Sequence, residues 1–277
     1  MKVKFWLQCA GYCLAHKHFA LRGSKREEIS FPATYGVIRH PEKGWILFDT
    51  GYTDRFFQET KSFPGKLYSM MTPVFVDKAE EAINQIQKLG IEAKDVEHII
   101  ISHFHADHVG GLKDFPYATF YCTAKALEIA KNYKGLAAVR RGVLPGLLPA
   151  DFFDRVKVVD QGAFPTRPHD IFGETVDLWG DGSILLPYLP GHAAGQMGGL
   201  FQTDQGEVLM TADAAWLKEN FQLDVLPSPI VKLFFDSWED FTESLSKVRR
   251  YWQAHPQAHI LPTHCQATYT SFVEQQN

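Results

Sequence analysis

The stretch HIIISHFHADHVGG, residues 98–111, carries the strongest structural signal in the chain. Its first half is a short β-branched run with apolar side chains on both faces, which is typical of a central strand covered by helices on either side. His103, His105, Asp107 and His108 follow at once. Buried imidazoles and carboxylates need partners and counter-charges, and a divalent cation supplies both. The stretch therefore predicts a buried strand that leads into a metal-binding loop.

The spacing of these four side chains indicates two neighbouring metal sites. Residues two apart in an extended segment point the same way, so His103 and His105 can bind one ion together. A turn into a helix then directs Asp107 and His108 to the other side. An ordinary loop of hydrogen-bonded histidines is the alternative, but the HxHxDH spacing matches a metal-site geometry.

Further ligands are expected at the ends of later strands. His192 in LPGHAAG, Asp213 in LMTAD and His264 in LPTH each follow an apolar, strand-like run. Taken singly, a histidine or aspartate at such a position is more often a capping or surface group. We predict from their order along the chain that all three complete the same site.

Strand signals extend in both directions from the central stretch. VKFWL (3–7), YGVIRH (35–40) and GWILFD (44–49) precede it, and the turn cluster PEKG predicts a hairpin between the last two. After it we expect strands at 118–122, 156–160, 175–179, 183–189, 196–202, 206–213 and 258–264. The early strands begin an antiparallel part of a sheet, and the later ones imply a second β-rich half.

Two helices are marked by capping boxes. Asp77, with Glu80 three residues on, begins the first, and Gly90 ends it. Its predicted apolar face consists of Ala79, Ile83, Ile86 and Leu89. Ser237, with Asp240 three residues on, begins the second. Its predicted apolar face consists of Trp238, Phe241, Leu245, Val248 and Trp252. This order of elements predicts an α/β (α+β) fold with two packed sheets and helices outside.

Composition bounds the size of the core and the class of partner. A chain of 277 residues that is 45% hydrophobic and 22% charged can bury a large core, and no biased linker divides residues 1–277 into separate domains. The formal net charge of −4 gives no electrostatic case for a nucleic-acid partner. The apolar stretch near the N-terminus is too short to span a bilayer. We expect one cytoplasmic domain with free cysteines and no membrane partner.

The motifs ILFDTG, HFHADHVGG, PGHAAG, TAD and THC occur in the order found in the metallo-β-lactamase superfamily and span nearly the whole chain. Within that superfamily the chain resembles the N-acyl homoserine lactonase group, which also has an early AG-x-C segment and a DA-x-x-x-KENF stretch. Here these segments read AGYC and DAAWLKENF. The resemblance implies a four-layer αββα sandwich with two mixed sheets, and a metal-dependent hydrolase that acts on ester bonds.

The resemblance also implies how the ligands are divided. The first metal would be held by His103, His105 and His192, the second by Asp107, His108 and His264, and Asp213 would bridge both. Asp49, at the end of ILFD, would support a ligating imidazole by accepting its remaining N–H. A simple turn aspartate before Thr50 and Gly51 is the alternative. The implied cofactors are two divalent ions, with Zn²⁺ favoured and Mn²⁺, Co²⁺ or Fe²⁺ admitted.

The implied reaction opens a lactone or ester, such as an N-acyl homoserine lactone, with a hydroxide that bridges the two metals. Asp107 would relay a proton to the leaving alkoxide. One position departs from the group, because Trp216 stands where a tyrosine usually follows the bridging aspartate by three residues. An indole N–H donates a hydrogen bond but cannot act as an acid. Trp216 therefore either orients the substrate carbonyl or forms a wall of the pocket.

The expected partner is a small molecule with an acyl or aromatic portion. The apolar segments 56–75 and 142–153 are interpreted as walls of its pocket, with core packing or a homodimer interface as the alternatives. Arg140 and Arg141 lie between these segments. They either meet an anionic substrate group or form a solvated surface pair.

Other functions stay open at this point. Related ligand sets serve thioesterases, phosphodiesterases and mononuclear iron enzymes that oxidise thiols or persulfides. The presence of Asp107, His108 and Asp213 favours two ions over a single iron. A non-catalytic binding protein of the same fold would be expected to lose ligands, and the sequence retains all seven.

Overall fold

The computed structural model describes residues 1–276 and places the predicted central strand, β5 (Val96–Ile100), inside a seven-stranded sheet. Both neighbours of β5, β3 (Gly44–Phe48) and β6 (Thr119–Cys122), run parallel to it. The strand order is β4-β1-β2-β3-β5-β6-β7. The other strands are β1 (Lys4–His16), β2 (Glu28–His40), β4 (Val74–Phe75) and β7 (Val156–Val158). β2 and β3 form the predicted antiparallel hairpin.

The second sheet has six strands in the order β13-β12-β11-β10-β9-β8. They are β8 (Thr166–His169), β9 (Gly173–Asp177), β10 (Ile184–Leu186), β11 (Gly199–Thr203), β12 (Gly206–Ala212) and β13 (His259–Pro262). Neighbouring strands are antiparallel except β12 and β13, which are parallel. That one parallel pair brings the C-terminal ends of β12 and β13 to the same edge.

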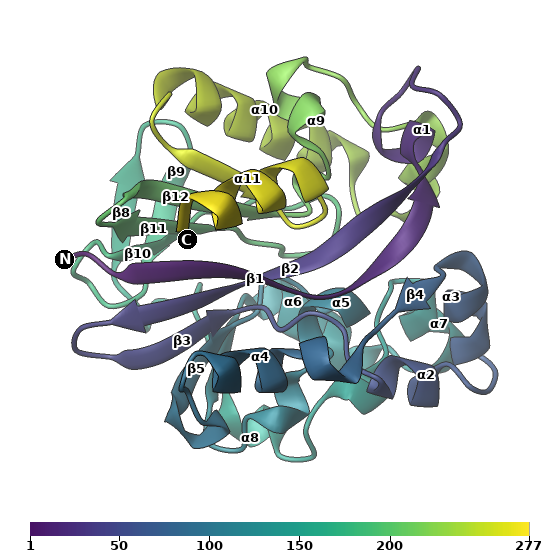
Figure 1. The fold of residues 1–277 in the computed structure, drawn as a ribbon, viewed down its shortest axis with the longest axis horizontal. Helices are drawn as coiled ribbons and strands as arrows, with labels where there is room; N and C mark the ends of the chain where they lie inside the picture. Colours follow the sequence, from purple (N-terminus) through teal and green to yellow (C-terminus); the bar gives the residue numbers. More distant parts are fainter. Residues whose placement is uncertain (277) are drawn as a thin grey trace.

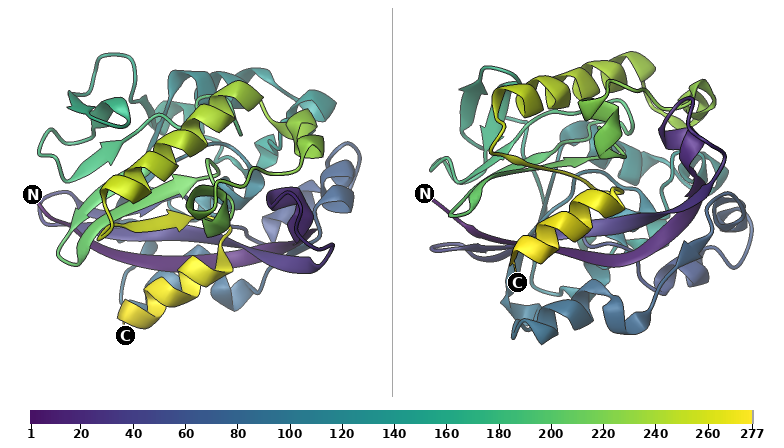
Figure 2. Two further views of the ribbon diagram at one scale, coloured as in Figure 1. Left: turned by 90° about the horizontal axis from the view of Figure 1, so that it is seen from above. Right: turned by 45° about the horizontal axis from the view of Figure 1, so that its top comes forward.

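Apolar side chains of the two sheets pack together in the middle of the molecule. Phe201 of the second sheet contacts Phe5 and Phe48 of the first, with ring centroids 5.2 Å and 5.9 Å apart. Helix α10 (Trp238–Ala254) covers the outer face of the second sheet. Helix α4 (Ala82–Lys88) covers the outer face of the first. Figures 1 and 2 show the resulting order of helix, sheet, sheet and helix, so the predicted four-layer sandwich is confirmed.

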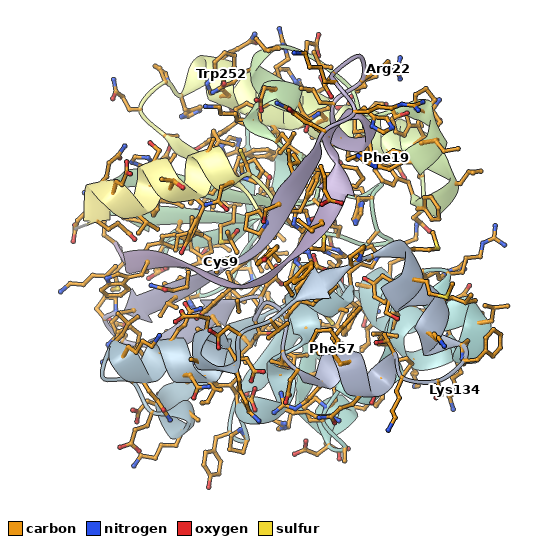
Figure 3. The ribbon with its side chains drawn as sticks, turned by 45° about the vertical axis from the view of Figure 1, so that its right-hand side comes forward. Cys9, Phe19, Arg22, Phe57, Lys134 and Trp252 are labelled. Carbon is orange, nitrogen blue, oxygen red and sulfur yellow. The ribbon has the colours of Figure 1, made fainter. Side chains whose placement is uncertain are left out.

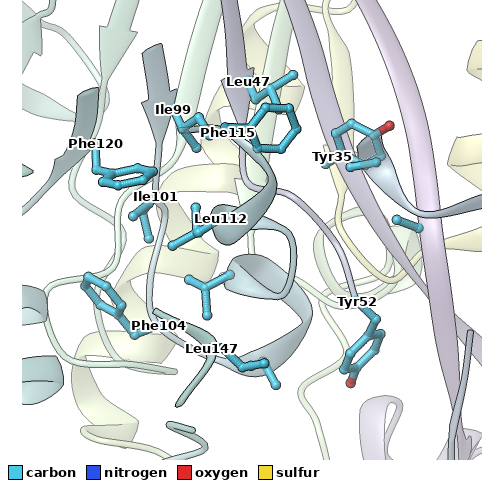
Figure 4. Close-up of a cluster of buried hydrophobic side chains, with 14 of the residues drawn as sticks. Tyr35, Leu47, Tyr52, Ile99, Ile101, Phe104, Leu112, Phe115, Phe120 and Leu147 are labelled. Atoms are coloured by element: carbon cyan, nitrogen blue, oxygen red, sulfur yellow. The ribbon is translucent and has the colours of Figure 1, made fainter. Parts of the chain in front are cut away.

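A second apolar cluster fills the space between the first sheet and its helices (Figure 4). Ile99 and Phe120 project into it from β5 and β6. Phe104 lies within the predicted metal-binding loop and Leu112 just after it, and both are buried in the cluster. The apolar side chains therefore hold the loop in place from within and from its far end.

The remaining helices are mostly short. They are α1 (Lys17–Ala20), α2 (Arg55–Glu59), α3 (Gly65–Met71), α5 (Ala106–Val109), α6 (Ala124–Asn132), α7 (Gly135–Val139), α8 (Phe152–Arg155), α9 (Lys218–Gln222) and α11 (Gln266–Gln276). None of the helices described between residues 1 and 276 has the combined length and apolar character that crossing a bilayer requires.

One of the two predicted helices begins later than its capping box indicated. The Asp77 side chain accepts the N–H of Ala79 at 2.9 Å, but only a 3₁₀ turn follows. Glu81 then has an extended backbone, so α4 begins at Ala82. The predicted apolar face is therefore wrong at both ends, since Ala79 and Leu89 are exposed. The second helix is confirmed, because Ser237 accepts the N–H of Asp240 at 3.2 Å and α10 begins at the next residue.

Candidate metal centre

Two pairs of parallel strands, one in each sheet, end next to the candidate site. In the first sheet, β3 leads to Asp49 and β5 leads to His103, and the Asp49 N–H donates to the carbonyl of Ile100 at 2.8 Å. In the second sheet, β12 and β13 lead to Asp213 and His264. Parallel neighbours end at the same edge of a sheet, so each pair of side chains is brought together by the strand pairing itself.

The structure gathers all seven predicted ligand side chains into one cluster. Their nitrogen and oxygen atoms form three groups, each with its atoms within 4.8 Å of one another: His103, His105 and His192; His103, His108 and Asp213; and Asp107, His108 and His264. Every one of these side chains is buried or half-buried. The first and third groups have the membership implied for the first and second metals, and the remaining group joins them.

The Asp213 carboxylate lies between the two halves of the cluster. Its Oδ2 atom is 3.1 Å from Nε2 of His192 on one side and 3.1 Å from Nε2 of His264 on the other. Its Oδ1 atom is 3.4 Å from Nε2 of His108. Asp213 therefore contacts histidines of both halves of the cluster.

Several buried polar atoms in the cluster have no hydrogen-bond partner within residues 1–276. They are Nε2 of His103, Nε2 of His108, Nδ1 of His192 and Oδ1 of Asp213. A buried polar atom without a partner costs about 1–3 kcal/mol, and four of them in one cluster indicate that a ligand binds there. Nδ1–H of His264 donates to the carbonyl of Pro32 at 2.9 Å, which leaves the Nε2 lone pair facing the cluster. The imidazole and carboxylate donors therefore fit divalent metal ions.

The Asp49 carboxylate forms hydrogen bonds at the base of the cluster, next to the predicted ligands of the first sheet. Its Oδ2 atom accepts from Nδ1 of His108 at 2.8 Å. The N–H and the hydroxyl of Ser102 donate to the same carboxylate at 2.8 Å and 2.7 Å. The Ser102 hydroxyl also lies 3.1 Å from Nδ1 of His103. Sequence reasoning missed Ser102, although its place directly between strand and ligand loop was a usable signal.

The backbone is strained at two positions that flank the cluster. Asp49 has a φ of 62° and Ala212, next to Asp213, has a φ of 46°. Residues other than glycine rarely adopt this left-handed region, and each instance costs on the order of 1 kcal/mol. Such strain persists where surrounding contacts fix the chain, and both positions direct a carboxylate towards the cluster.

Burial and neighbouring charges set the protonation of the ligands. Burial lowers the pKa of His103 well below its ordinary value and that of His192 to about 3. Burial alone would raise the pKa of Asp107, but His108 and His264 outweigh it and lower that pKa to about 2. Metal ligands must be neutral imidazoles and ionised carboxylates, so these three groups are already in the ligating form.

His108, like His264, differs from the other histidines of the cluster in having a raised pKa. Burial alone would lower its pKa, but the carboxylates of Asp107 and Asp49 raise it well above the ordinary value. Without a metal, the His108 imidazole is therefore protonated and lies between the carboxylates of Asp107 and Asp49. A divalent ion would replace that proton, so binding at this group releases it.

A close approach of loop and helix fixes His192. The preceding Gly191 has a φ of 120°, and a Cβ atom there would lie 2.0 Å from the backbone N of Phe241 in α10. The N–H of Ser237 donates to the carbonyl of Gly191 at 3.0 Å, and that of Asp236 to the carbonyl of His192 at 3.3 Å. The start of α10 therefore positions the His192 side chain, and only glycine fits at 191.

The Trp216 indole faces the cluster. Its Nε1–H donates to Oδ2 of Asp213 at 3.1 Å. Its ring packs edge-on against His192 and Phe235, with centroids 5.7 Å and 5.4 Å apart. The single donor of the indole is thus directed at a carboxylate of the cluster, and the ring forms part of the surrounding wall.

A cavity of about 340 Å³ adjoins His105 and His192. Its lining is Phe104, His105, Ala126, Ile129, Arg140, Arg141, Val143, His192, Ala193, Ala194, Leu233, Phe234, Phe235 and Asp236. Of the two apolar segments interpreted as pocket walls, 142–153 contributes Val143, and 56–75 contributes nothing to this lining. Figure 3 shows Phe57, which belongs to segment 56–75, in the lower helical layer, and Trp252 of α10 in the upper one.

Comparison with known proteins agrees with this geometry. The family model of the metallo-beta-lactamase superfamily matches residues 30–251 of the chain. The N-acyl homoserine lactonase AttM of Agrobacterium fabrum is 28% identical over 229 residues, which cover 82% of this chain and 80% of that protein. The AttM of Rhizobium johnstonii is 27% identical over 246 residues, covering 88% and 86% of the two chains.

Solved structures share the fold at lower identity. An N-acyl homoserine lactone hydrolase with N-hexanoyl-L-homoserine at its catalytic metal center matches with a TM-score of 0.72 at 22% identity, covering 98% of this chain and 97% of that one. The dizinc quorum-quenching lactonase AidC matches with a TM-score of 0.66 at 15% identity, covering 95% and 88%. The expectation of a metal-dependent hydrolase is confirmed. The chain belongs to the metallo-β-lactamase superfamily, within which it is similar to the N-acyl homoserine lactonases.

Proposed function

We propose that the protein hydrolyses lactones or esters with an acyl portion, using two divalent metal ions, of which Zn²⁺ suits the donors best. The observation that carries this proposal is the convergence of seven donor side chains, four of which have buried atoms without a hydrogen-bond partner among residues 1–276. The relatives named above, which are N-acyl homoserine lactonases, support the substrate class.

His103, His105 and His192 would hold one ion, Asp107, His108 and His264 the other, and Asp213 would contact both. When bound, two such ions lower the pKa of a water between them and polarise a carbonyl. The chain's own contribution is orientation. Asp49 and Ser102 fix the imidazole of His108 through short hydrogen bonds, so that its Nε2 atom faces the cluster.

Asp107 is the group placed to carry a proton. Its Oδ2 atom lies 3.3 Å from Nε2 of His108 and 3.4 Å from Nε2 of His264 at the edge of the cluster. A water oxygen adds to the carbonyl carbon, and the carboxylate of Asp107 accepts the proton that this water loses. The bond from the carbonyl carbon to the alkoxy oxygen then breaks, and Asp107 returns the proton to the leaving alkoxide.

Trp216 serves as a positioning residue in this scheme. The usual tyrosine could supply a hydroxyl to the substrate, whereas the only N–H of the indole is donated to Asp213 at 3.1 Å. That hydrogen bond fixes the rotamer of the carboxylate that lies between both halves of the cluster. Chemistry at the substrate carbonyl is therefore left to the metal ions and to Asp107.

A substrate panel tests this proposal. The purified protein is assayed on an N-acyl homoserine lactone, an open-chain ester, a thioester and a phosphodiester of similar size, before and after chelation. We expect lactone or ester hydrolysis that is lost on chelation and regained with zinc, manganese or cobalt. The His255→Ala variant, which alters a histidine outside the cluster, should behave like the wild type. Faster turnover of the thioester or the phosphodiester than of every lactone and ester would reject the proposal.

A further inference from the structure

Two arginines line the cavity beside the cluster. Arg140 and Arg141 follow α7 and face the same space as the ligands His105 and His192. The sequence left open whether they meet a substrate or form a solvated surface pair. Arg140 is exposed and Arg141 is half-buried, so the place in the cavity lining favours the first interpretation chiefly for Arg141.

Both guanidinium groups lack a counter-charge. Within residues 1–276, neither comes within 4.0 Å of a carboxylate, although most other arginines of the chain have one. Nε of Arg141 is buried and has no hydrogen-bond partner. Its guanidinium carbon lies 4.0 Å from the centre of the Tyr133 ring, which stacks against one face and restrains the side chain. A partly buried cation with unused donors calls for an anionic partner.

The arginine segment packs directly against the metal cluster. Gly142 has a φ of 70°, and a Cβ atom there would lie 2.4 Å from Cδ2 of His105. Any other residue at 142 would push the segment away from this ligand. The backbone of Arg141 is therefore next to the reacting centre, and a molecule bound at the cluster extends past the two arginines when it enters the cavity.

The rest of the lining defines the shape of that molecule. Phe104, Ile129 and Val143 make one side of the cavity apolar, and Leu233 and Phe235 contribute from the other. The single acidic side chain of the lining, Asp236, is 3.4 Å from Nζ of Lys125. Because Lys125 offsets that carboxylate, the two arginines leave the cavity with a net positive charge.

We propose that the acyl portion of the substrate carries a carboxylate that binds to Arg140 and Arg141. The inference rests on the proposed function and narrows it to lactones or esters of an acyl group that ends in an acid. Two guanidinium forks match the planar geometry of a carboxylate, and the apolar lining contacts the carbon chain that joins it to the reacting carbonyl. Neutral acyl groups would leave both cations unpaired.

A matched pair of substrates tests this inference. The acyl chain of a homoserine lactone is made to end in a carboxylate or in the isosteric carboxamide, and kcat/KM is measured for each. We expect the wild type to favour the carboxylate by about tenfold or more, as charge-assisted hydrogen bonds imply. In the Arg140→Met, Arg141→Met double variant this ratio should fall to about one. Arg141→Lys keeps the charge without the fork and should restore part of the ratio.

A control variant and a binding measurement accompany the assay. Arg250→Met, which removes a surface arginine of α10 paired with Glu243, should retain the wild-type ratio. Calorimetry with the lactam analogue of each substrate reports binding without turnover and should show the same preference. Equal kcat/KM for both substrates in the wild type would overturn this inference and leave the proposed function standing. If the metal-loaded protein hydrolyses neither substrate, the proposed function fails and this inference fails with it.

Discussion

The metal cluster and the cavity wall beside it are built in opposite ways. His103, His108 and Asp49 are fully buried, and short hydrogen bonds through Ser102 join them. The wall consists of helix α6, the segment 140–143 after α7 and the 3₁₀ helix Pro229–Phe234, whose Leu233 is 69% exposed. The residues of the cluster follow strand ends of both sheets, whereas short helical segments at the surface form the wall.

This difference separates two tasks. Metal chemistry needs ligands held in a fixed geometry, which rigid strand ends and buried partners provide. Substrate recognition tolerates variation, because surface segments can change sequence without disturbing the sheets. Substitutions in the cluster should therefore affect metal content and all substrates alike, and substitutions in the wall should affect one substrate class against another.

The largest effect is expected from His105→Ala. Removing a ligand should lower metal affinity and kcat/KM by more than the roughly 100-fold that the loss of a supporting group causes. Metal analysis of the purified variant beside lactone assays measures both quantities. Full activity with normal metal content would place His105 outside the centre, even though its Nδ1 atom lies 2.9 Å from Nε2 of His192.

Asp49→Asn should weaken metal binding about 10- to 100-fold. Asparagine tolerates the left-handed backbone at this position, but its amide cannot accept from His108 and from both Ser102 donors. Competition with a chromophoric chelator measures the affinity. Asp224→Asn is the matched control, because Asp224 has a φ of 59° at the surface, away from the cluster. Equal affinities in both variants would remove Asp49 from the site.

Trp216→Phe should reduce kcat about tenfold, because the hydrogen bond to a charged carboxylate is lost while the aromatic wall remains. KM should change little if the ring only positions Asp213. Steady-state kinetics beside Trp252→Phe, a tryptophan of α10, separates the two constants. A rise in KM with unchanged kcat would instead assign Trp216 to substrate binding.

Much of the site could be predicted because it is local in sequence. His103 to His108 lie in one loop after one strand, and the strand was recognisable from its β-branched run. His192, Asp213 and His264 followed from their shared position after apolar runs. The role of Ser102 and the contact between the start of α10 and His192 were not predicted, because both depend on contacts that the chain forms only when folded.

The fold was predicted less completely where structure depends on distant partners. β1 runs to His16 and β2 starts at Glu28, well beyond the expected strands, because each supports the other across a bulge between Cys9 and Tyr12. Helix α11 was not predicted. It is held at its end by Gln276, which donates to the carbonyl of Phe5 at 2.6 Å on the open edge of β1.

His98, which lies outside the cluster, makes the stability of the protein sensitive to acid. Burial, with Lys157, Lys43 and His40 nearby, lowers the pKa of His98 to about 4. Between this value and the usual 6.5 the unfolded chain binds a proton that the folded chain does not, so stability falls as the pH falls through that window. Urea unfolding of the metal-free protein should show a smaller loss for His98→Gln than for the wild type. An identical pH dependence would assign the loss to other groups.

The smallest effect is expected in the wall. Leu233→Ala should leave stability within about 0.5 kcal/mol of the wild type, because the side chain is 69% exposed. It should lower kcat/KM only a few-fold, and only for long acyl chains that reach the wall. A series of acyl lengths measures this, and a uniform loss across the series would show that the wall also shapes the reacting centre.

The central claim is that the seven clustered side chains hold two divalent ions. Elemental analysis of freshly purified protein by inductively coupled plasma mass spectrometry, beside the protein concentration, tests it most directly. Two divalent ions per chain, predominantly zinc, would agree with the arrangement around Asp213. One iron per chain, or an active protein without metal, would contradict it.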